Sequence, residues 1–140
     1  MYLIDTNVLS ELRKAKSGKA DPNVINWANS VEVGKLFLSS VTVFEIEMGI
    51  LRLERKDPSQ GSVLRNWFES QVIPAFSECI IAFDTKIALC CARLHVPEPK
   101  SERDSMIAAT ALVNNFSVVT RNTKDFIHTG VQLINPWEFN

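Results

Sequence analysis

The sequence predicts a three-layer α/β/α fold, in which helices cover both faces of a mostly parallel sheet of about five strands. Short apolar runs of strand length alternate along the chain with longer amphipathic segments. Strands separated by helices need crossover connections, which make neighbouring strands parallel. The chain has 140 residues, of which 46% are hydrophobic, enough for one core without disulfides or structural metal. We therefore expect a single domain over residues 1–140.

Five short segments are predicted to be strands because they are apolar and of strand length. In order they are Tyr2–Ile4, Leu36–Ser40, Ile80–Phe83, Ser117–Thr120 and Val131–Ile134. Six longer segments between them have a helical pattern of apolar residues. They are Asn7–Lys14, Pro22–Ser30, Val43–Arg55, Gly61–Phe76, Thr85–Leu94 and Arg103–Asn115. The final Trp137 and Phe139 indicate a tail packed onto the body.

Composition excludes several classes of protein. The formal charge of −1 gives no overall attraction for nucleic acid, so any such contact needs a local basic patch. Cys79, Cys90 and Cys91 form no CxxC pair, which favours reduced thiols inside a cell. His95 and His128 lie far apart without a neighbouring cysteine, which argues against zinc. No apolar run approaches the ~20 residues of a membrane helix, and we expect a cytoplasmic protein with no membrane contact.

Two acidic residues are candidate site residues, although each also has a simpler structural explanation. Asp5 directly follows the first predicted strand, and Asp is a favoured residue for capping the start of a helix. Glu45 stands three residues after Thr42, the spacing of a capping box. From the sequence alone, capping and catalysis both remain open for these two residues.

Asp104 is the more informative acid. It is in register with an apolar stripe that should face the sheet, formed by Ile107, Ala108, Ala111 and Leu112. A carboxylate at the head of such a stripe is costly unless it is paired, hydrogen-bonded or bound to metal. Ser101 is a candidate cap for this helix. A further polar cluster, from Thr120 through Asn122 to Asp125, opens as the fourth predicted strand ends.

Topology places these groups together. In a parallel sheet with helical crossovers, the carboxyl ends of strands and the amino ends of helices share the edge where ligands bind. Asp5 and Thr120 to Asp125 follow strands, whereas Glu45 and Asp104 begin helices. Clustered carboxylates need a cation to offset their repulsion, and oxygen ligands select Mg²⁺ or Mn²⁺. Such an ion supports hydrolysis of a phosphodiester, which is the chemistry that we expect.

Four segments in this order resemble the PIN-domain family, and within it the VapC toxins and their FitB-like relatives. The segments are Leu3–Leu9, Leu38–Glu45, Asp104–Ala111 and Val119–Phe126, and the ending Asn135–Trp137 also fits. The resemblance spans nearly the whole chain and implies a PIN-like fold. It implies a metal-dependent endoribonuclease, usually dimeric, that serves as the toxin of a type II toxin–antitoxin system.

The resemblance also implies a substrate and partners. The expected substrate is structured RNA, tRNA or rRNA, whose cutting inhibits translation. Attack by water on the scissile phosphate would leave a 5′-phosphate and a 3′-hydroxyl. The expected partners are a second copy of the chain, a VapB/FitA-like antitoxin, and operator DNA bound by the larger assembly. The alternatives are a PIN nuclease that processes RNA without being a toxin, and a catalytically silent PIN domain that binds RNA or protein.

By residue, the resemblance places Asp5, Glu45 and Asp104 on the three acidic metal positions and Thr6 or Asn7 on the adjoining polar positions. Asn122 occupies the place of a fourth acid found in some relatives, with Asp125 three residues later. This departure leaves three roles open for Asp125: a ligand of a second metal, an orienting group for water together with Asn122, or support for the loop.

Basic and apolar residues suggest contact surfaces. Arg13 and Lys14, in a cluster completed by Lys16 and Lys19, and Arg121 and Lys124 beside the site are candidate RNA contacts, as is Arg103. The predicted helix Val43–Arg55 is apolar around most of its circumference. This indicates either a protein interface with a second subunit or antitoxin segment, or burial between the Gly61–Phe76 helix and the sheet.

Two other α/β classes with clustered acids fit less well. A phosphoacceptor receiver domain needs an acidic pair after its first strand and a lysine after its last. Here the first strand is followed by Asp5, Thr6 and Asn7, and no lysine follows Ile134. A dehalogenase-type phosphatase needs a second aspartate where Asn7 stands.

Overall fold

The computed structural model describes residues 1–140, whose five strands form one sheet in which every neighbouring pair is parallel. The strand order is β3-β2-β1-β4-β5, so β1 lies at the centre. The strands are β1 (Tyr2–Ile4), β2 (Leu36–Ser39), β3 (Ile80–Ile81), β4 (Ser117–Val119) and β5 (Leu133–Ile134). The predicted three-layer α/β/α fold is confirmed, and the sheet is wholly parallel.

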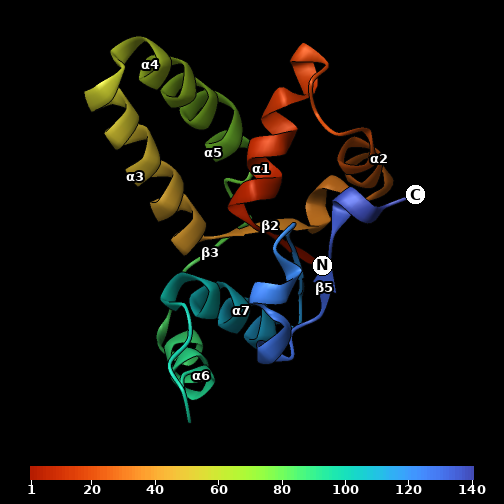
Figure 1. The fold of residues 1–140 in the computed structure, drawn as a ribbon, viewed down its shortest axis with the longest axis vertical. Coiled ribbons are helices and arrows are strands. Elements are labelled where there is room, and N and C mark those ends of the chain that lie inside the picture. Colours follow the sequence, from red (N-terminus) through yellow and green to blue (C-terminus); the bar gives the residue numbers. More distant parts are fainter.

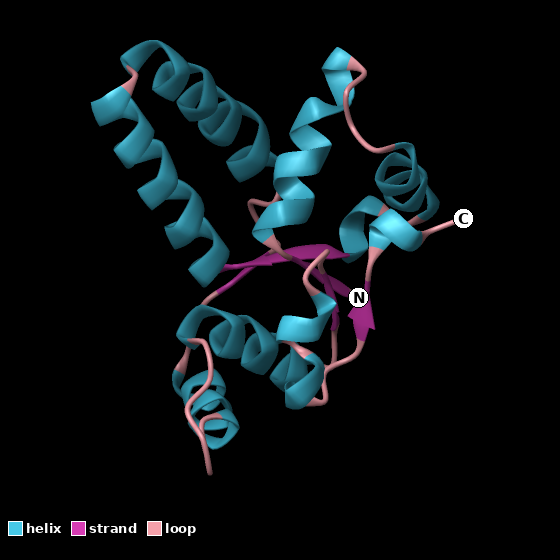
Figure 2. Ribbon diagram, viewed as in Figure 1, coloured by secondary structure: helices cyan, strands magenta, loops and turns pink.

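Helices cover both faces of the sheet, as Figures 1 and 2 show. One side carries α1 (Thr6–Arg13), α2 (Pro22–Ser30), α3 (Ser40–Lys56), α4 (Pro58–Trp67) and the single turn α5 (Ile73–Ala75). The other side carries α6 (Thr85–Leu94) and α7 (Glu102–Asn114). None of these helices combines the length and the apolar character needed to cross a bilayer.

The alternation of side chains along the strands divides the core into two halves. In β1, Leu3 packs on the side of α7, whereas Ile4 packs on the side of α1 and α3. In β4, Val118 and Val119 divide in the same way. Successive residues of a strand point to opposite faces, so two adjacent apolar residues supply both layers. This explains why the buried strands are continuously apolar.

The loop after β4 and the C-terminal tail are both held by buried side chains. Phe126, which is fully buried, anchors the loop in the half of the core beneath α7. Trp137 and Phe139 pack against the other half, and the Asn23 side-chain amide donates to the Trp137 carbonyl oxygen at 2.8 Å. The predicted packing of the tail is therefore confirmed.

The ends of several elements differ from the prediction. Helix α3 begins at Ser40 rather than Val43, because the Ser39 hydroxyl accepts a hydrogen bond from the Val41 N–H at 3.0 Å and caps the helix. Thr42 therefore lies inside the helix, with its hydroxyl unpartnered, and the capping box with Glu45 does not form. The predicted helix over Gly61–Phe76 begins at Pro58 and passes through a π-helical turn at Phe68–Val72. The four later strands are shorter than predicted.

Helices α3 and α4 form a tightly packed hairpin. Arg65 on α4 donates to Glu47 at 2.6 Å and to Glu54 at 2.8 Å, both on α3. At Gly61 the helices approach so closely that an added Cβ would lie 2.6 Å from the Glu54 Cα. Glycine is therefore needed at position 61 because the two helices approach each other closely, and not because of an unusual backbone conformation.

We predict that Gly61→Ala lowers the free energy of unfolding by about 1–3 kcal/mol, the usual cost of overpacking. Gly49→Ala is the matched control, because Gly49 is an exposed glycine of α3 with open space around its Cα. Alanine there should stabilise the protein by about 0.5–1 kcal/mol, as in other helix interiors. Urea unfolding of both variants measures the difference; equal stability of the two would contradict the close packing of the hairpin.

Candidate functional site

The site is built on the adjacent carboxyl ends of β1 and β4. Their register pairs Ile4 with Val119, so the next residues, Asp5 and Thr120, lie side by side. The Asp5 N–H donates to the Val119 carbonyl oxygen at 3.0 Å, and the Thr120 hydroxyl donates to Asp5 Oδ2 at 2.8 Å. The sheet therefore fixes the position of Asp5 through both its backbone and its side chain.

Asp5 also caps α1. Its Oδ1 accepts a hydrogen bond from the Thr6 N–H at 2.8 Å. The capping interpretation is thus confirmed, and it does not exclude a role in the site, because the carboxylate oxygens retain further acceptor capacity. Asp5 is only 8% exposed. Burial at the edge of the sheet therefore holds one carboxylate in a single orientation.

Asn7 ties the loop after β4 to the start of α1. Its side-chain amide donates to the Thr120 hydroxyl at 3.2 Å, and its side-chain oxygen accepts from the Arg121 N–H at 3.2 Å. The Asn122 N–H also donates to the Thr120 hydroxyl, at 3.1 Å. Thr120 thus accepts two hydrogen bonds and donates its one proton to Asp5. The polar cluster predicted at Thr120 to Asn122 serves to orient Asp5.

Glu45 reaches the site from the second turn of α3. Its Oε1 accepts from the Thr6 hydroxyl at 3.5 Å, and its Oε2 lies 3.7 Å from the Arg103 guanidinium. Arg103 immediately precedes Asp104 in the first turn of α7. Residues from α1, α3 and α7 that lie far apart in sequence are therefore brought to the same edge.

The carboxylates act on one another electrostatically. Burial raises the pKa of Asp5, and the charges of Asp104 and Asp125 raise it further against the opposing hydrogen bonds. Burial and the charge of Asp5 likewise raise the pKa of Glu45, although Arg103 opposes this. Burial and Asp125 raise the pKa of Asp104, whereas Ser101 and His128 lower it. The four acids predicted from the sequence are therefore coupled electrostatically.

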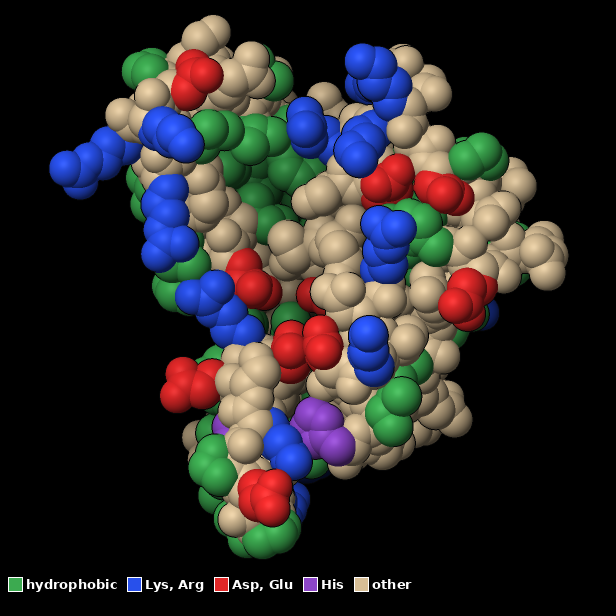
Figure 3. All heavy atoms as spheres, in the orientation of Figure 1, with side chains coloured by type: hydrophobic (Ala, Val, Ile, Leu, Met, Phe, Trp, Pro, Cys, Tyr) green, Lys and Arg blue, Asp and Glu red, His purple; other side chains and the backbone are tan.

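A space-filling view shows acidic side chains gathered in the middle of one face, with lysines and arginines on either side (Figure 3). Several of the basic residues also have intramolecular contacts. Arg13 lies over the Trp67 ring at 5.9 Å, Arg121 lies over Trp137 at 5.0 Å, and Lys14 pairs with Glu11 at 3.1 Å. Lys124 is exposed. Their contact with RNA remains a prediction.

The donor set fits a hard divalent cation in chemistry and only partly in arrangement. It consists of carboxylates, hydroxyls and an amide, the oxygen ligands preferred by Mg²⁺ and Mn²⁺. No three acidic, histidine or cysteine side chains are arranged to hold one ion as they stand. Asp5 is fixed, whereas Glu45 and Asp104 are only partly buried. The three carboxylates therefore do not form a ready-made cation site in this conformation.

Two features of the site were not predicted from the sequence. His128 lowers the pKa of Asp104, although it lies after the loop and carries no local signal. A cavity of about 450 Å³ lies between the first turns of α3 and α7, lined in part by Phe44 and Arg103. Both depend on how separate segments pack, which periodicity alone does not give.

Comparison with known proteins places this arrangement in a family. The family model described as the PIN domain matches residues 2–131. The VapC ribonuclease Y4jK of Sinorhizobium fredii is 34% identical over 143 residues, covering 99% of each chain. The toxin FitB of Neisseria gonorrhoeae is 32% identical over 143 residues, covering 98% of this chain and 99% of FitB.

A solved structure, that of FitAB bound to an IR36 DNA fragment, matches with a TM-score of 0.87 at 30% identity, covering 100% of this chain and 98% of the matched one. Fold, segment order and family model agree, and the chain belongs to the PIN-domain family, with VapC and FitB toxins among its relatives.

Proposed function

We propose that this protein is a divalent-cation-dependent endoribonuclease and the toxin of a type II toxin–antitoxin pair. The observation that carries the proposal is the gathering of Asp5, Glu45 and Asp104 at one sheet edge, with the pKa of each raised by burial. Acids are kept close together at such a cost where a cation offsets it. The similarity to a VapC ribonuclease and to FitB supports the same activity.

In the proposed mechanism, Asp5, Glu45 and Asp104 would hold Mg²⁺ or Mn²⁺, with Asp125 as a further carboxylate of the same cluster. When bound, the cation would supply neutralising charge and would activate water for attack on the phosphodiester. Thr120 and the Thr6 N–H orient Asp5, and the Thr6 hydroxyl steadies Glu45. Exposed basic residues on either side of the acids, including Arg121 and Lys124, bind flanking phosphates. The products carry a 5′-phosphate and a 3′-hydroxyl.

We further propose tRNA or rRNA as the substrate, with inhibition of translation as the result, and a VapB/FitA-like antitoxin as a partner. The solved FitAB complex with DNA supports an assembly of toxin and antitoxin on operator DNA. A cleft of about 310 Å³, lined by residues of α1, α3 and α4, opens beside Glu45. Leu64 and Trp67 line it, and it offers an apolar seat for an antitoxin segment. We also propose that two copies of the chain form a homodimer.

The first prediction from this function concerns cleavage. On total tRNA and rRNA with Mg²⁺ or Mn²⁺, we expect discrete cuts with 5′-phosphate ends, abolished by EDTA. Asp5→Asn, Glu45→Gln and Asp104→Asn should each lower the rate by more than about 100-fold, because each removes a charge that holds the cation. Mapping the new RNA ends by sequencing measures both the rate and the position.

The matched control is Glu47→Gln, which removes an acid two residues from Glu45 that instead bonds Arg65 on α4. It should retain cutting. Unchanged cutting by correctly folded Asp5 and Asp104 variants would refute the acidic site. Cyclic phosphate ends would instead indicate attack by the ribose 2′-hydroxyl.

The second prediction concerns pH. Thr120→Val removes the hydroxyl that donates to Asp5, and loss of a hydrogen bond to a carboxylate raises its pKa. Activity needs the ionised acid, so the acid limb of the rate profile should move to higher pH. Thr120→Ser keeps the donor and should leave the limb in place. Superimposable profiles for Thr120→Val and the wild type would contradict this role.

The third prediction concerns stability. An acid whose pKa is raised on folding binds more protons in the folded state, so the folded protein loses stability as pH rises above the ordinary value of 3.8 for Asp104. In EDTA at neutral pH, Asp104→Asn should therefore raise Tm by about 3–4 °C for each kcal/mol gained, and the gain should vanish near pH 4. Mn²⁺ should raise Tm of the wild type more than that of the variant.

Glu98→Gln, which removes an acid that is 80% exposed and is not one of the site residues, is the control for the loss of one charge. A lower Tm for Asp104→Asn than for this control at neutral pH would show that Asp104 stabilises the fold instead of straining it.

A further inference from the structure

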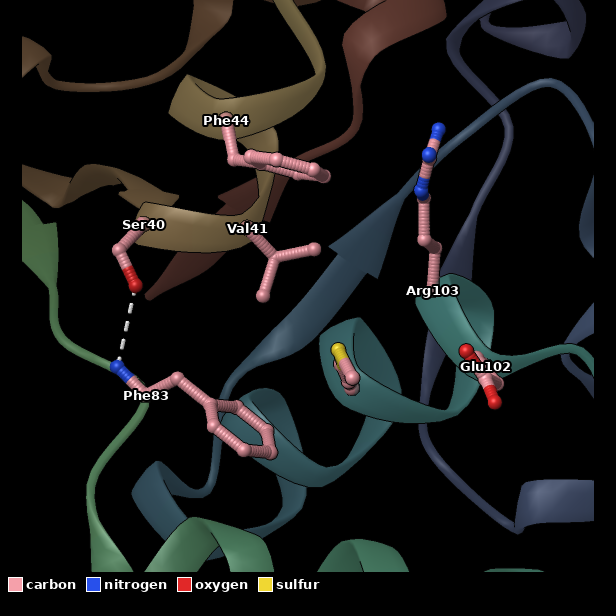
Figure 4. A pocket seen from close by; sticks show the side chains of 7 residues that line it. Ser40, Val41, Phe44, Phe83, Glu102 and Arg103 are labelled. Carbon is pink, nitrogen blue, oxygen red and sulfur yellow. Dashed lines mark hydrogen bonds between the residues drawn. The ribbon is translucent and has the colours of Figure 1, made fainter.

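The cavity between α3 and α7 lies next to the acids but contains none of them. It has a volume of about 450 Å³ and is lined by Ser40, Val41, Phe44, Phe83, Glu102, Arg103 and Met106. Figure 4 shows Phe44 on α3 and Arg103 on α7 on opposite sides of the hollow, with Phe83 along its lower wall. The volume exceeds that of a single planar ring system.

The cavity and the acidic site are adjacent because they share two helix turns. Phe44 precedes Glu45 on α3, and Arg103 precedes Asp104 on α7. Consecutive helical residues point about 100° apart, so each helix directs one side chain to the acids and its neighbour to the cavity. The Arg103 guanidinium spans the boundary, 3.7 Å from Glu45 and 5.4 Å from the centre of the Phe44 ring.

The lining favours a flat, uncharged group with polar edges. Phe44 is 55% exposed and lines the cavity, so its ring is accessible to a flat stacking partner. Glu102 would repel a phosphate, whereas its carboxylate can accept from an amino group. The Ser40 oxygen already accepts from the Phe83 N–H at 3.0 Å, which leaves the hydroxyl proton free to donate.

We propose that this cavity binds an unpaired nucleobase of the RNA substrate, next to the phosphodiester at the acids. The proposal rests on the proposed ribonuclease function and extends it to substrate recognition. In this arrangement the base stacks on the Phe44 ring, and Arg103, which lies between Glu45 and that ring, contacts a neighbouring phosphate. Unstacked bases of loops are commonly held by aromatic rings and arginine planes in this way.

The test compares the wild type with Phe44→Ala, Phe44→Trp and Leu51→Ala on a pool of RNA hairpins with randomised loops. Leu51 is the matched control, because it is also 55% exposed on α3 but does not line the cavity. We expect the wild type to prefer certain bases at one position beside the cut. Phe44→Ala should lose this preference and about tenfold in kcat/KM, whereas Phe44→Trp and Leu51→Ala should keep both.

An abasic nucleotide at that position should cost the wild type about the same tenfold and cost Phe44→Ala nothing further. An additional loss in Phe44→Ala would overturn the proposal, as would a uniform fall in rate with the preference intact. Light scattering on each variant tests whether a second copy of the chain occupies the cavity instead of a base. A change of mass with Phe44→Ala would assign the cavity to contact with a second copy of the chain.

A binding measurement separates this proposal from the nuclease. Single-stranded RNA carrying 2-aminopurine is added to Asp104→Asn, alone and combined with Phe44→Ala, so that no cutting is needed. A fluorescence change that depends on Phe44 supports the base site even if the wild type cuts no RNA. Absence of any change in both variants would overturn the base site and leave the nuclease proposal unaffected.

Discussion

The site depends on one hydrogen bond between the ends of two neighbouring strands, from the Thr120 hydroxyl to Asp5. The parallel register of β1 and β4 brings the two residues together, and the bond then fixes the carboxylate that α1 also needs as its cap. The loop after β4 is bound to the same hydroxyl through Asn7 and Asn122. Sheet, helix and loop thus meet at a single side chain.

The other acids of the site are held less rigidly than Asp5. Glu45 and Asp104 stand in the early turns of helices that pack on opposite faces of the sheet, so the relative position of α3 and α7 sets their separation. Arg103 partly offsets the negative field by pairing with Glu45. Under the proposed function, one rigid acid and two adjustable ones would let a cation and a substrate be accommodated together, at the expense of some stability in their absence.

The sequence predicted the fold class because alternating apolar segments leave few other topologies, and the central strands matched closely. It also predicted the gathering of the four acids, because strand ends and helix starts share one edge of a parallel sheet. It did not locate the start of α3, since Ser39 and Thr42 are both suitable caps and only packing shows that Ser39 is used. The π-helical turn at Phe68–Val72 and the cavity beside Phe44 also arise from contacts between distant segments.

The adjacency of Phe44 to Glu45 and of Arg103 to Asp104 has a consequence for divergence among paralogues. Phe44 is half-exposed and is not one of the acids, so it can be exchanged without removing a carboxylate, whereas exchange of Arg103 also removes the partner of Glu45. An insertion in the first turn of α3 or α7 would instead rotate the acid and the neighbouring side chain that faces the cavity together. Under the proposed function, substitution at Phe44 is therefore a route by which copies of such a gene would acquire distinct targets while keeping the same acids.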